Sequence, residues 1–177
     1  MAGNRSVDAA PRLIQPDARM HEAFCRMFED YQASGHHEWC EEAALAATDF
    51  PAYVNAVRDK AAGSALSDEW APTSYFWMQI GDDLVGTLRI RHYLTPAVIE
   101  RAGHIGYDIA PAFRGRGLGH EILRLGLVEA TKLGIGDVLL LCSAKNMASR
   151  RIIERHGGTL DRIKDNEMWY WIRRNGG

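Results

Sequence analysis

A segment rich in glycine and arginine is the part of the sequence whose residue types most clearly permit chemistry. It reads Arg114-Gly115-Arg116-Gly117-Leu118-Gly119 and precedes a long helical pattern. Glycines let the backbone approach a ligand and adopt positive φ angles. The first turn of a helix offers unpaired N–H groups at the positive end of the helix dipole. Because two arginines add positive charge, the segment predicts an anion-binding loop suited to phosphate.

The glycine spacing separates this loop from two other phosphate-binding motifs. The glycines follow G-x-G-x-G, whereas the dinucleotide-binding fingerprint G-x-G-x-x-G needs a glycine where this chain has His120. No Gly-Lys-Ser/Thr follows, so the loop is not the P-loop of nucleoside triphosphatases. Hairpins predicted on both sides of the loop also disfavour a nucleotide-binding Rossmann domain.

A second segment strengthens the interpretation of the first. An apolar stretch at 137–142 leads into Asn146-Met147-Ala148-Ser149-Arg150-Arg151-Ile152-Ile153-Glu154-Arg155-His156-Gly157. Together with Arg114-x-x-Gly117-x-Gly119, this segment resembles the two cofactor motifs of the GNAT acetyltransferases. The resemblance covers residues 74–172 in element order, and more weakly the two helices predicted before them. Asn146 is also a good helix N-cap in its own right, and both roles are compatible.

The resemblance implies acetyl-CoA as co-substrate and assigns residues to it. Backbone groups of Tyr107 and Ile109 would pair with the acyl and pantetheine amides. Arg114 and Gly115 would form the entrance of the loop. The amides that would cradle the pyrophosphate belong to Arg116, Gly117, Leu118 and Gly119, and the residues expected to contact the cofactor's arm are Asn146 and Ser149.

The reaction implied by the resemblance is direct attack of a neutral amine on the thioester. Such a reaction needs a donor for the developing oxyanion, which we expect from a β-bulge amide near Tyr107. It also needs a base, often one that works through water. Asp108 and His104 are the candidates on the predicted cofactor strand, although alternation places them on the face opposite Tyr107 and Ile109.

A proton donor for the leaving thiolate is harder to find. The tyrosine that the family often uses falls at Ile153, which has no proton to give. Ser143, Cys142 and Tyr170 are possible substitutes, and their order is open. His36, His37 and Glu38 lie in the stretch where such enzymes often build the acceptor pocket.

Two functions therefore compete. The first is an N-acetyltransferase acting on a small-molecule or protein amine, and the second is a non-catalytic acyl-CoA binding or sensing domain that has lost its acid. We favour the enzyme, because the amine is itself nucleophilic, the thioester is activated, and a thiol pKa near ~8.5 makes the thiolate a fair leaving group. The sequence does not identify the acceptor.

The elements expected to position these residues form an α/β fold. Strands are predicted at 12–14, 74–80, 84–93, 104–109, 137–142, 159–163 and 168–172, and helices at 17–31, 51–61, 117–133 and 146–156. Their order predicts a mixed, largely antiparallel and splayed sheet of about six to seven strands flanked by helices, as in the GNAT fold. Residues 1–11 are expected to be a flexible tail and residues 12–177 one domain.

Bulk composition narrows the partners and the compartment. The chain has 177 residues, 46% hydrophobic and 25% charged, with a net charge of −2. No basic field predicts a nucleic-acid partner, and no apolar run predicts a membrane span. Three cysteines without a CxxC pair fit a reducing cytoplasm and no metal site. A homodimer is compatible with the family resemblance.

Overall fold

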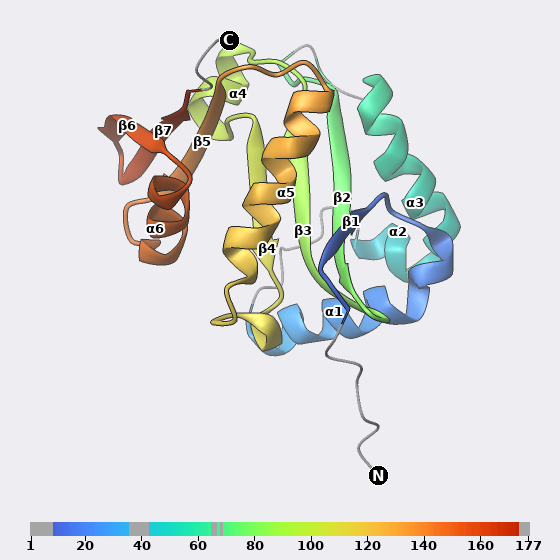
Figure 1. The fold of residues 1–177 in the computed structure, drawn as a ribbon. Helices are drawn as coiled ribbons and strands as arrows, with labels where there is room; N and C mark the ends of the chain where they lie inside the picture. Colours follow the sequence, from blue (N-terminus) through green and yellow to red (C-terminus); the bar gives the residue numbers. More distant parts are fainter. Residues whose placement is uncertain (1–8, 36–42, 65–66, 68, 174–177) are drawn as a thin grey trace.

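The computed structural model describes residues 9–35, 43–64, 67 and 69–173. Two antiparallel sheets organise this part of the chain (Figure 1). The first has the order β1-β2-β3-β4, with strands Arg12–Ile14, Thr73–Ile80, Asp83–Arg91 and Ile105–Ile109. The second has the order β5-β7-β6, with β5 at Val138–Ser143, β6 at Gly158–Lys164 and β7 at Glu167–Ile172. The expected mixed fold class, with largely antiparallel strands and flanking helices, is confirmed.

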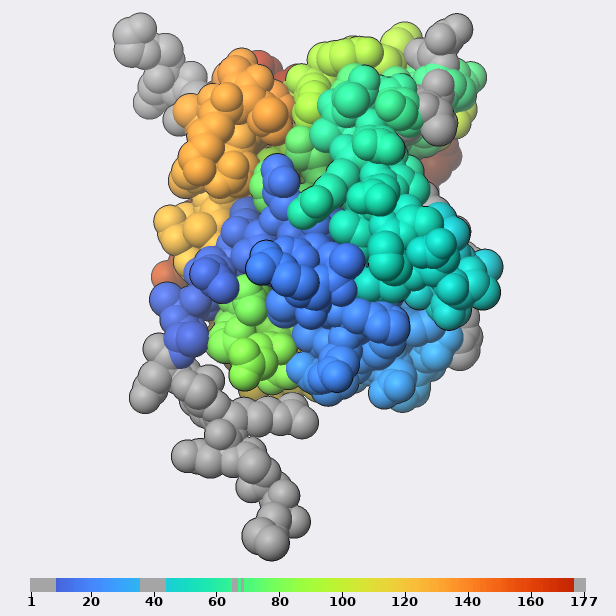
Figure 2. All heavy atoms as spheres, turned by 90° about the vertical axis from the view of Figure 1, so that its right-hand side faces the viewer, coloured from blue at the N-terminus to red at the C-terminus, as the bar shows by residue number. Residues whose placement is uncertain are grey.

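Helices cover both faces of the first sheet. One face carries α1 (His21–Ala33), α2 (Ala43–Thr48) and α3 (Phe50–Asp59), which Figure 2 shows side by side on the surface. The opposite face carries α5 (Leu118–Lys132), and α6 (Met147–Arg155) packs between α5 and the second sheet. Short 3-10 turns lie at Ala18–Met20, Lys60–Ala62 and Pro111–Phe113, and α4 spans Pro96–Arg101.

The two faces bury separate cores because side chains alternate along each strand. Beneath α5 the core is aliphatic, and Leu88 of β3 packs against Gly126 of that helix. A Cβ on Gly126 would lie 2.9 Å from Leu88 Cδ1, so glycine allows the helix to approach the sheet closely. Beneath the N-terminal helices the core is aromatic, with Phe24 at its centre against Phe50 and Trp77.

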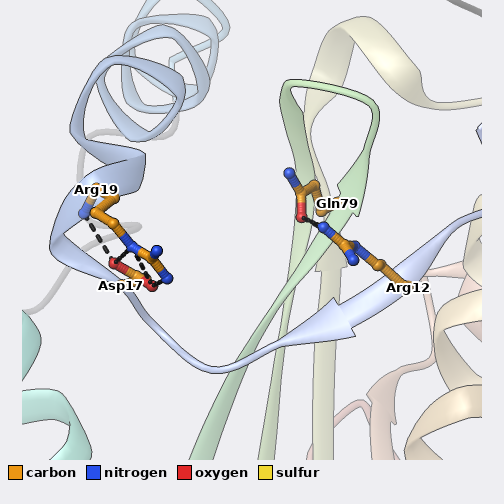
Figure 3. A network of polar contacts seen from close by, with 4 residues as sticks. All are labelled: Arg12, Asp17, Arg19 and Gln79. Carbon is orange, nitrogen blue, oxygen red and sulfur yellow. Dashed lines mark hydrogen bonds and ion pairs between the residues drawn. The ribbon is translucent and has the colours of Figure 1, made fainter.

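Polar contacts attach the short strand β1 at the edge of the first sheet (Figure 3). Arg12 Nε and Nη2 donate to Gln79 Oε1 at 3.1 and 3.0 Å. Beyond the strand, the Asp17 carboxylate accepts from the Arg19 backbone N–H at 2.9 Å and starts the turn that leads into α1. The Arg19 guanidinium lowers the pKa of Asp17 to about 2. These contacts fix the chain at the entry to α1.

The two sheets meet at one end of the neighbouring strands β4 and β5. The His104 backbone N–H donates to Leu139 O at 2.7 Å, and the Leu139 N–H donates to His104 Nδ1 at 3.0 Å. An isolated bridge joins Gly103 to Leu140 beside them. Beyond this joint the two strands diverge (Figure 1).

Three features differ from the sequence expectations. The short helices α2 and α4 were not predicted, although Thr95 caps α4 by accepting from the Val98 N–H at 3.1 Å. The expected bulge near Tyr107 is wrong, because β3 and β4 pair in unbroken register over residues 105–109. The extra residue lies instead in β3, where Val85 falls between the partners of Met78 and Gln79. His36, His37 and Glu38 lie outside the described residues.

Candidate functional site

A groove of about 620 Å³ opens where β4, the loop after it, α5 and α6 come together. Its lining includes most of the residues that the sequence assigned to cofactor binding: Tyr107, Ile109, Arg114, Gly115, Gly117, Leu118, Gly119, Asn146 and Ser149. It also includes Asp108. Arg116, His104, Ser143 and Tyr170 do not line it. Segments 30 to 40 residues apart in the sequence thus meet at one groove.

The free edge of β4 supplies backbone groups to this groove. His104 O accepts from the Arg91 N–H at 2.8 Å, and the Ala110 N–H donates to Val85 O at 2.9 Å. Because hydrogen-bonded and non-bonded pairs alternate in an antiparallel ladder, these two bonds orient the even-numbered residues of β4 toward β3. The N–H and C=O groups of Tyr107 and Ile109 therefore point away from β3.

The glycine loop has the backbone that the spacing predicted. Gly115 and Gly117 have φ angles of 76° and 78°, in the left-handed region that favours glycine. Gly117 is the N-cap of α5 and has no side-chain capping partner, so the first amides of the helix face the groove. Gly119 has a different role, because a Cβ there would lie 2.6 Å from Ile152 Cδ1. That glycine allows α5 and α6 to pack closely.

The arginines of the loop differ in their partners. Arg114 Nε donates to Ile109 O at 2.8 Å, and its Nη2 lies 3.2 Å from Asp108 Oδ1. Arg116 Nη2 donates to Ala112 O at 3.0 Å, and its guanidinium lies over the Phe113 ring at 5.3 Å. The side chains of Arg114 and Arg116 therefore stabilise the loop through contacts with the segment that precedes it. In α6, Arg150 is paired with Glu154 at 2.9 Å, while Arg151 lines the groove.

The start of α6 places two polar groups beside the groove. Asn146 caps the helix by accepting from the Ser149 N–H at 3.0 Å, which leaves its amide NH₂ available. The Tyr107 hydroxyl is buried without a partner of hydrogen-bonding geometry. Burial raises the pKa of this phenol to about 12, and an interaction with the Ser149 hydroxyl opposes the rise. Tyr107 and Ser149 are thus the hydroxyl side chains among the groove-lining residues.

Asp108 lies on the other face of β4, as strand alternation predicted. Its Oδ1 accepts from the Tyr31 hydroxyl at 3.0 Å and from Arg114 Nη2 at 3.2 Å. Burial first, and then the charge of Asp108, raise the pKa of the Tyr31 phenol well above its usual range. Both partners donate a hydrogen bond to the same carboxylate oxygen. This carboxylate links α1 to the strand and to the loop.

His104 occupies the joint between the two sheets. Its Nδ1 accepts from the Leu139 N–H, so the ring is neutral with its proton on Nε2. Burial, with a smaller contribution from Arg91, lowers the pKa of His104 to about 4. The ring also lies 6.5 Å from Trp171 in an edge-on arrangement.

The candidate proton donors are arranged around the second sheet. Tyr170 is 1% exposed, and its hydroxyl donates to Glu154 Oε1 at 3.0 Å. Burial first, and then Glu154, raise the pKa of Tyr170 to about 12. Ser143 Oγ accepts from the side-chain amide of Asn166 at 3.3 Å. Cys142 is buried, which raises the pKa of its thiol, and Ile153 is 1% exposed in the aliphatic core.

Several groove residues were not predicted from the sequence as part of the site. They are Phe113, His120, Ala148 and Ile152. His120 lies 5.7 Å from His156, measured between ring centroids, at the ends of α5 and α6. The position of His120 directly after the last loop glycine was a signal that sequence reasoning used only to exclude another motif.

Neither a metal nor a membrane span is indicated over the described ranges. No group of three or more His, Cys, Asp or Glu side chains there has metal-binding geometry. Within the same ranges, no helix is long and apolar enough to span a bilayer.

The fold and groove define an acyl-CoA-dependent transferase, and comparison with known families agrees. The family model of the acetyltransferase (GNAT) domain matches residues 9–159. The chain therefore belongs to the GNAT acetyltransferase family and is an acetyl-CoA-dependent N-acetyltransferase. No curated protein sequence matches the chain.

Solved structures share the fold at low sequence identity. RimJ of Mycobacterium smegmatis, in complex with CoA disulfide, is 18% identical with a TM-score of 0.70, covering 93% of this chain and 82% of that one. An acetyltransferase of Salmonella typhimurium that modifies the N-terminal serine of ribosomal protein L7/L12 is 16% identical, with a TM-score of 0.63 and coverage of 97% and 99%. The microcin C7 self-immunity acetyltransferase MccE, in complex with acetyl-CoA and AMP, is 13% identical, with a TM-score of 0.64 and coverage of 94% and 93%.

Proposed function

We propose that this acetyltransferase moves the acetyl group of acetyl-CoA to a primary amine by direct attack, with Asp108 as the base. One observation carries the proposal: Asp108 and the outward backbone groups of Tyr107 belong to adjacent residues of β4, at the groove. A proton acceptor and an oxyanion donor therefore lie next to each other on a rigid strand.

The groove fits acetyl-CoA by the chemistry of its donors. The amides of residues 116–119, at the positive end of α5, suit a pyrophosphate. The C=O of Tyr107 and the N–H groups of Tyr107 and Ile109 suit the amides of a pantetheine arm, like an added strand. The Asn146 amide and the Ser149 hydroxyl face the same groove, and Arg114 and Gly115 form its entrance.

Asp108 performs the proton transfer in this proposal. Its carboxylate takes a proton from the acceptor ammonium, directly or through one water, and the neutral amine then forms the C–N bond as the C–S bond breaks. The N–H groups of Tyr107 and Ile109 stabilise the oxyanion. Acetyl-CoA supplies the activated acyl group and a thiolate leaving group. The nitrogen loses its second proton as the amide forms, and the Ser149 hydroxyl, which lines the groove, relays a proton to the thiolate in this proposal. The hydrogen bonds between His104 and Leu139, which join the two sheets, give His104 a structural role.

The competing function is a non-catalytic acyl-CoA sensor. The apolar Ile153 at the family's tyrosine position favours it, but Asp108 favours the enzyme. Neither Ser143 nor Tyr170 lines the groove, so we propose no catalytic step for them.

Free-thiol release separates the two functions. The full chain is incubated with acetyl-CoA and a panel of small amines and of peptides with free N-termini. We expect thiol release that depends on the amine and acetylated amine in equal amount by mass spectrometry. Binding of acetyl-CoA without turnover across the whole panel would favour the sensor.

The remaining assignments are proposals of the same kind. The acceptor is a small-molecule or protein amine, and the N-terminal serine amine modified by the Salmonella neighbour is one candidate. We further propose one domain over residues 12–177 behind a tail at 1–11, a cytoplasmic location and a homodimer. We propose no nucleic-acid or membrane partner. Sedimentation of the purified chain measures the oligomeric state.

A further inference from the structure

Two arginine side chains of β3 lie beside Gly106 of β4, a position that carries no side chain. Arg89 pairs with Gly106 in the ladder, and Arg91 lies on the same face two residues further along. A Cβ built on Gly106 would have Arg89 Nε and Arg91 Nη1 as its nearest neighbours, each at 3.8 Å. Because Gly106 carries no side chain, both guanidinium groups border one small area of the sheet surface.

The partners of the two side chains differ. Arg91 is held in place, since its Nη1 donates to Gly103 O at 3.2 Å and its guanidinium lies over the Trp70 ring at 5.7 Å. Arg89 Nε is buried, and over the described ranges it has no hydrogen-bond partner. A buried donor without a partner is uncommon in folded proteins and calls for an explanation. A bound anion would satisfy it.

The surroundings of Arg89 are cationic and aromatic. Its other ladder partner, Tyr75 of β2, lies 5.3 Å beneath Lys60 Nζ. Asp108 is the acidic side chain of β4 on this face, and its paired cation is Arg114. The face therefore has local positive charge in a chain whose net charge is −2.

The proposed mechanism requires the amine to reach Asp108. The helices α5 and α6 lie on the opposite side of β4, whereas Asp108, which also lines the groove, shares with Gly106 the face that bears Arg89. We propose that Arg89 and Arg91 form an anion-binding subsite over Gly106, so that the preferred acceptor is an amine that also carries a carboxylate or phosphate group. This inference rests on the proposed function, and it names the substrate class of that site.

The chemistry of the guanidinium group supports the assignment. Its planar array of N–H donors matches the oxygens of a carboxylate or phosphate, and such bonds are stronger than those between neutral groups. A side chain at position 106 would occupy the space where the anion is expected.

Matched acceptors test the charge preference. The peptides Ala-Glu-Ala-amide and Ala-Gln-Ala-amide share one free N-terminus and differ in a single carboxylate, and 4-aminobutanoate with 4-aminobutanamide forms the small-molecule pair. We expect kcat/KM to favour the carboxylate of one pair by about 10- to 100-fold. The pair with the larger ratio identifies a peptide or a small molecule as the source of the anion. Equal rates within both pairs would overturn the proposal.

Substitutions at Arg89 test whether the preference for a carboxylate-bearing acceptor depends on this side chain. Arg89→Gln should remove the ratio between the paired acceptors, and Arg89→Lys should restore part of it. Arg19→Gln is the matched control, because the Arg19 side chain is 89% exposed and pairs with Asp17 in the turn before α1 (Figure 3). All three variants should keep the thermal protection given by CoA. A ratio that survives in Arg89→Gln would overturn the assignment.

A binding measurement covers the case in which no acceptor turns over. Calorimetry with acetyl-Ala-Glu-Ala-amide and acetyl-Ala-Gln-Ala-amide, in the presence of CoA, reports the subsite without chemistry. Tighter binding of the Glu peptide, lost in Arg89→Gln, would support the subsite even if the enzyme proposal failed. Equal affinity for both peptides would contradict it.

Discussion

The proposed phosphate end and the proposed acyl end of the groove are built in different ways. The phosphate end consists of backbone amides from one continuous loop, and its requirements are glycines and a helix start. At the acyl end, side chains from separate elements meet, because Tyr31 of α1 and Arg114 of the loop both donate to Asp108 of β4. A backbone site leaves a local pattern in the sequence, whereas a site of converging side chains does not.

The sharpest test of the phosphate end compares the two glycines at the ends of α5. Gly117 and Gly134 have φ angles of 78° and 77°, and neither has an atom within 4 Å of the position of a Cβ. Replacing either by Glu should cost similar stability, roughly 1–2 kcal/mol, because both enter the left-handed region. Only Gly117→Glu adds negative charge at the groove, so we expect ~1,000-fold weaker acetyl-CoA binding in that variant alone.

Calorimetry with acetyl-CoA and thermal unfolding measure the two quantities separately. If Gly134→Glu weakened acetyl-CoA binding as much as Gly117→Glu, the loss would reflect the fold, and the cradle assignment would be wrong.

The acyl end is tested by Asp108→Asn. We expect kcat to fall by ~100-fold with acetyl-CoA affinity retained, because the amide cannot accept the proton. Tyr31→Phe is the matched control: it removes one hydrogen bond to the same carboxylate, keeps the charge, and should lower kcat only a few-fold. An Asp108→Asn variant with unchanged kcat and pH–rate profile would remove Asp108 as the base.

The pH dependence of folding stability distinguishes a structural role of His104 from a catalytic one. Its folded-state pKa is about 4, below the ordinary value of 6.5, so the unfolded chain binds more protons between these two pH values. Stability is therefore unaffected by His104 above pH 6.5 and decreases as the pH falls toward 4. At pH 5 we expect a loss of ~2 kcal/mol relative to pH 7.

His104→Asn retains an acceptor for the Leu139 N–H and does not titrate. Urea unfolding at several pH values should show a smaller pH dependence in this variant, with the pH–rate profile of acetyl transfer unchanged. A shifted pH–rate profile would return His104 to the list of candidate bases.

The sequence predicted the backbone of the glycine loop, the start of α6 and the order of the main elements. The spacing of Gly115, Gly117 and Gly119 marked the loop, and the capping residue Asn146 marked the start of α6. Ile153 was correctly expected to offer no proton, and the structure adds that it packs in the aliphatic core. These features are local, so periodicity and cap residues were sufficient to find them.

Other features depend on tertiary contacts and were not predictable in this way. The neutral tautomer of His104 follows from an N–H that lies 35 positions further along the chain. The bulge was expected in β4 but occurs in β3, because a bulge depends on the register with a partner strand.

The helix α4, by contrast, could have been predicted from the sequence, since Thr95-Pro96 is a recognisable helix start.

The joint at Gly103, His104 and Leu139 sets how closely the two sheets approach each other. A Cβ on Gly103 would lie 2.6 Å from Leu139 O, so the two sheets can approach this closely only with glycine there. From the glycine loop, the lining of the groove extends along β4 as far as Tyr107, three residues from His104. We therefore expect a side chain at position 103 to force β4 and β5 apart and to displace the backbone groups of Tyr107 and Ile109 that line the groove.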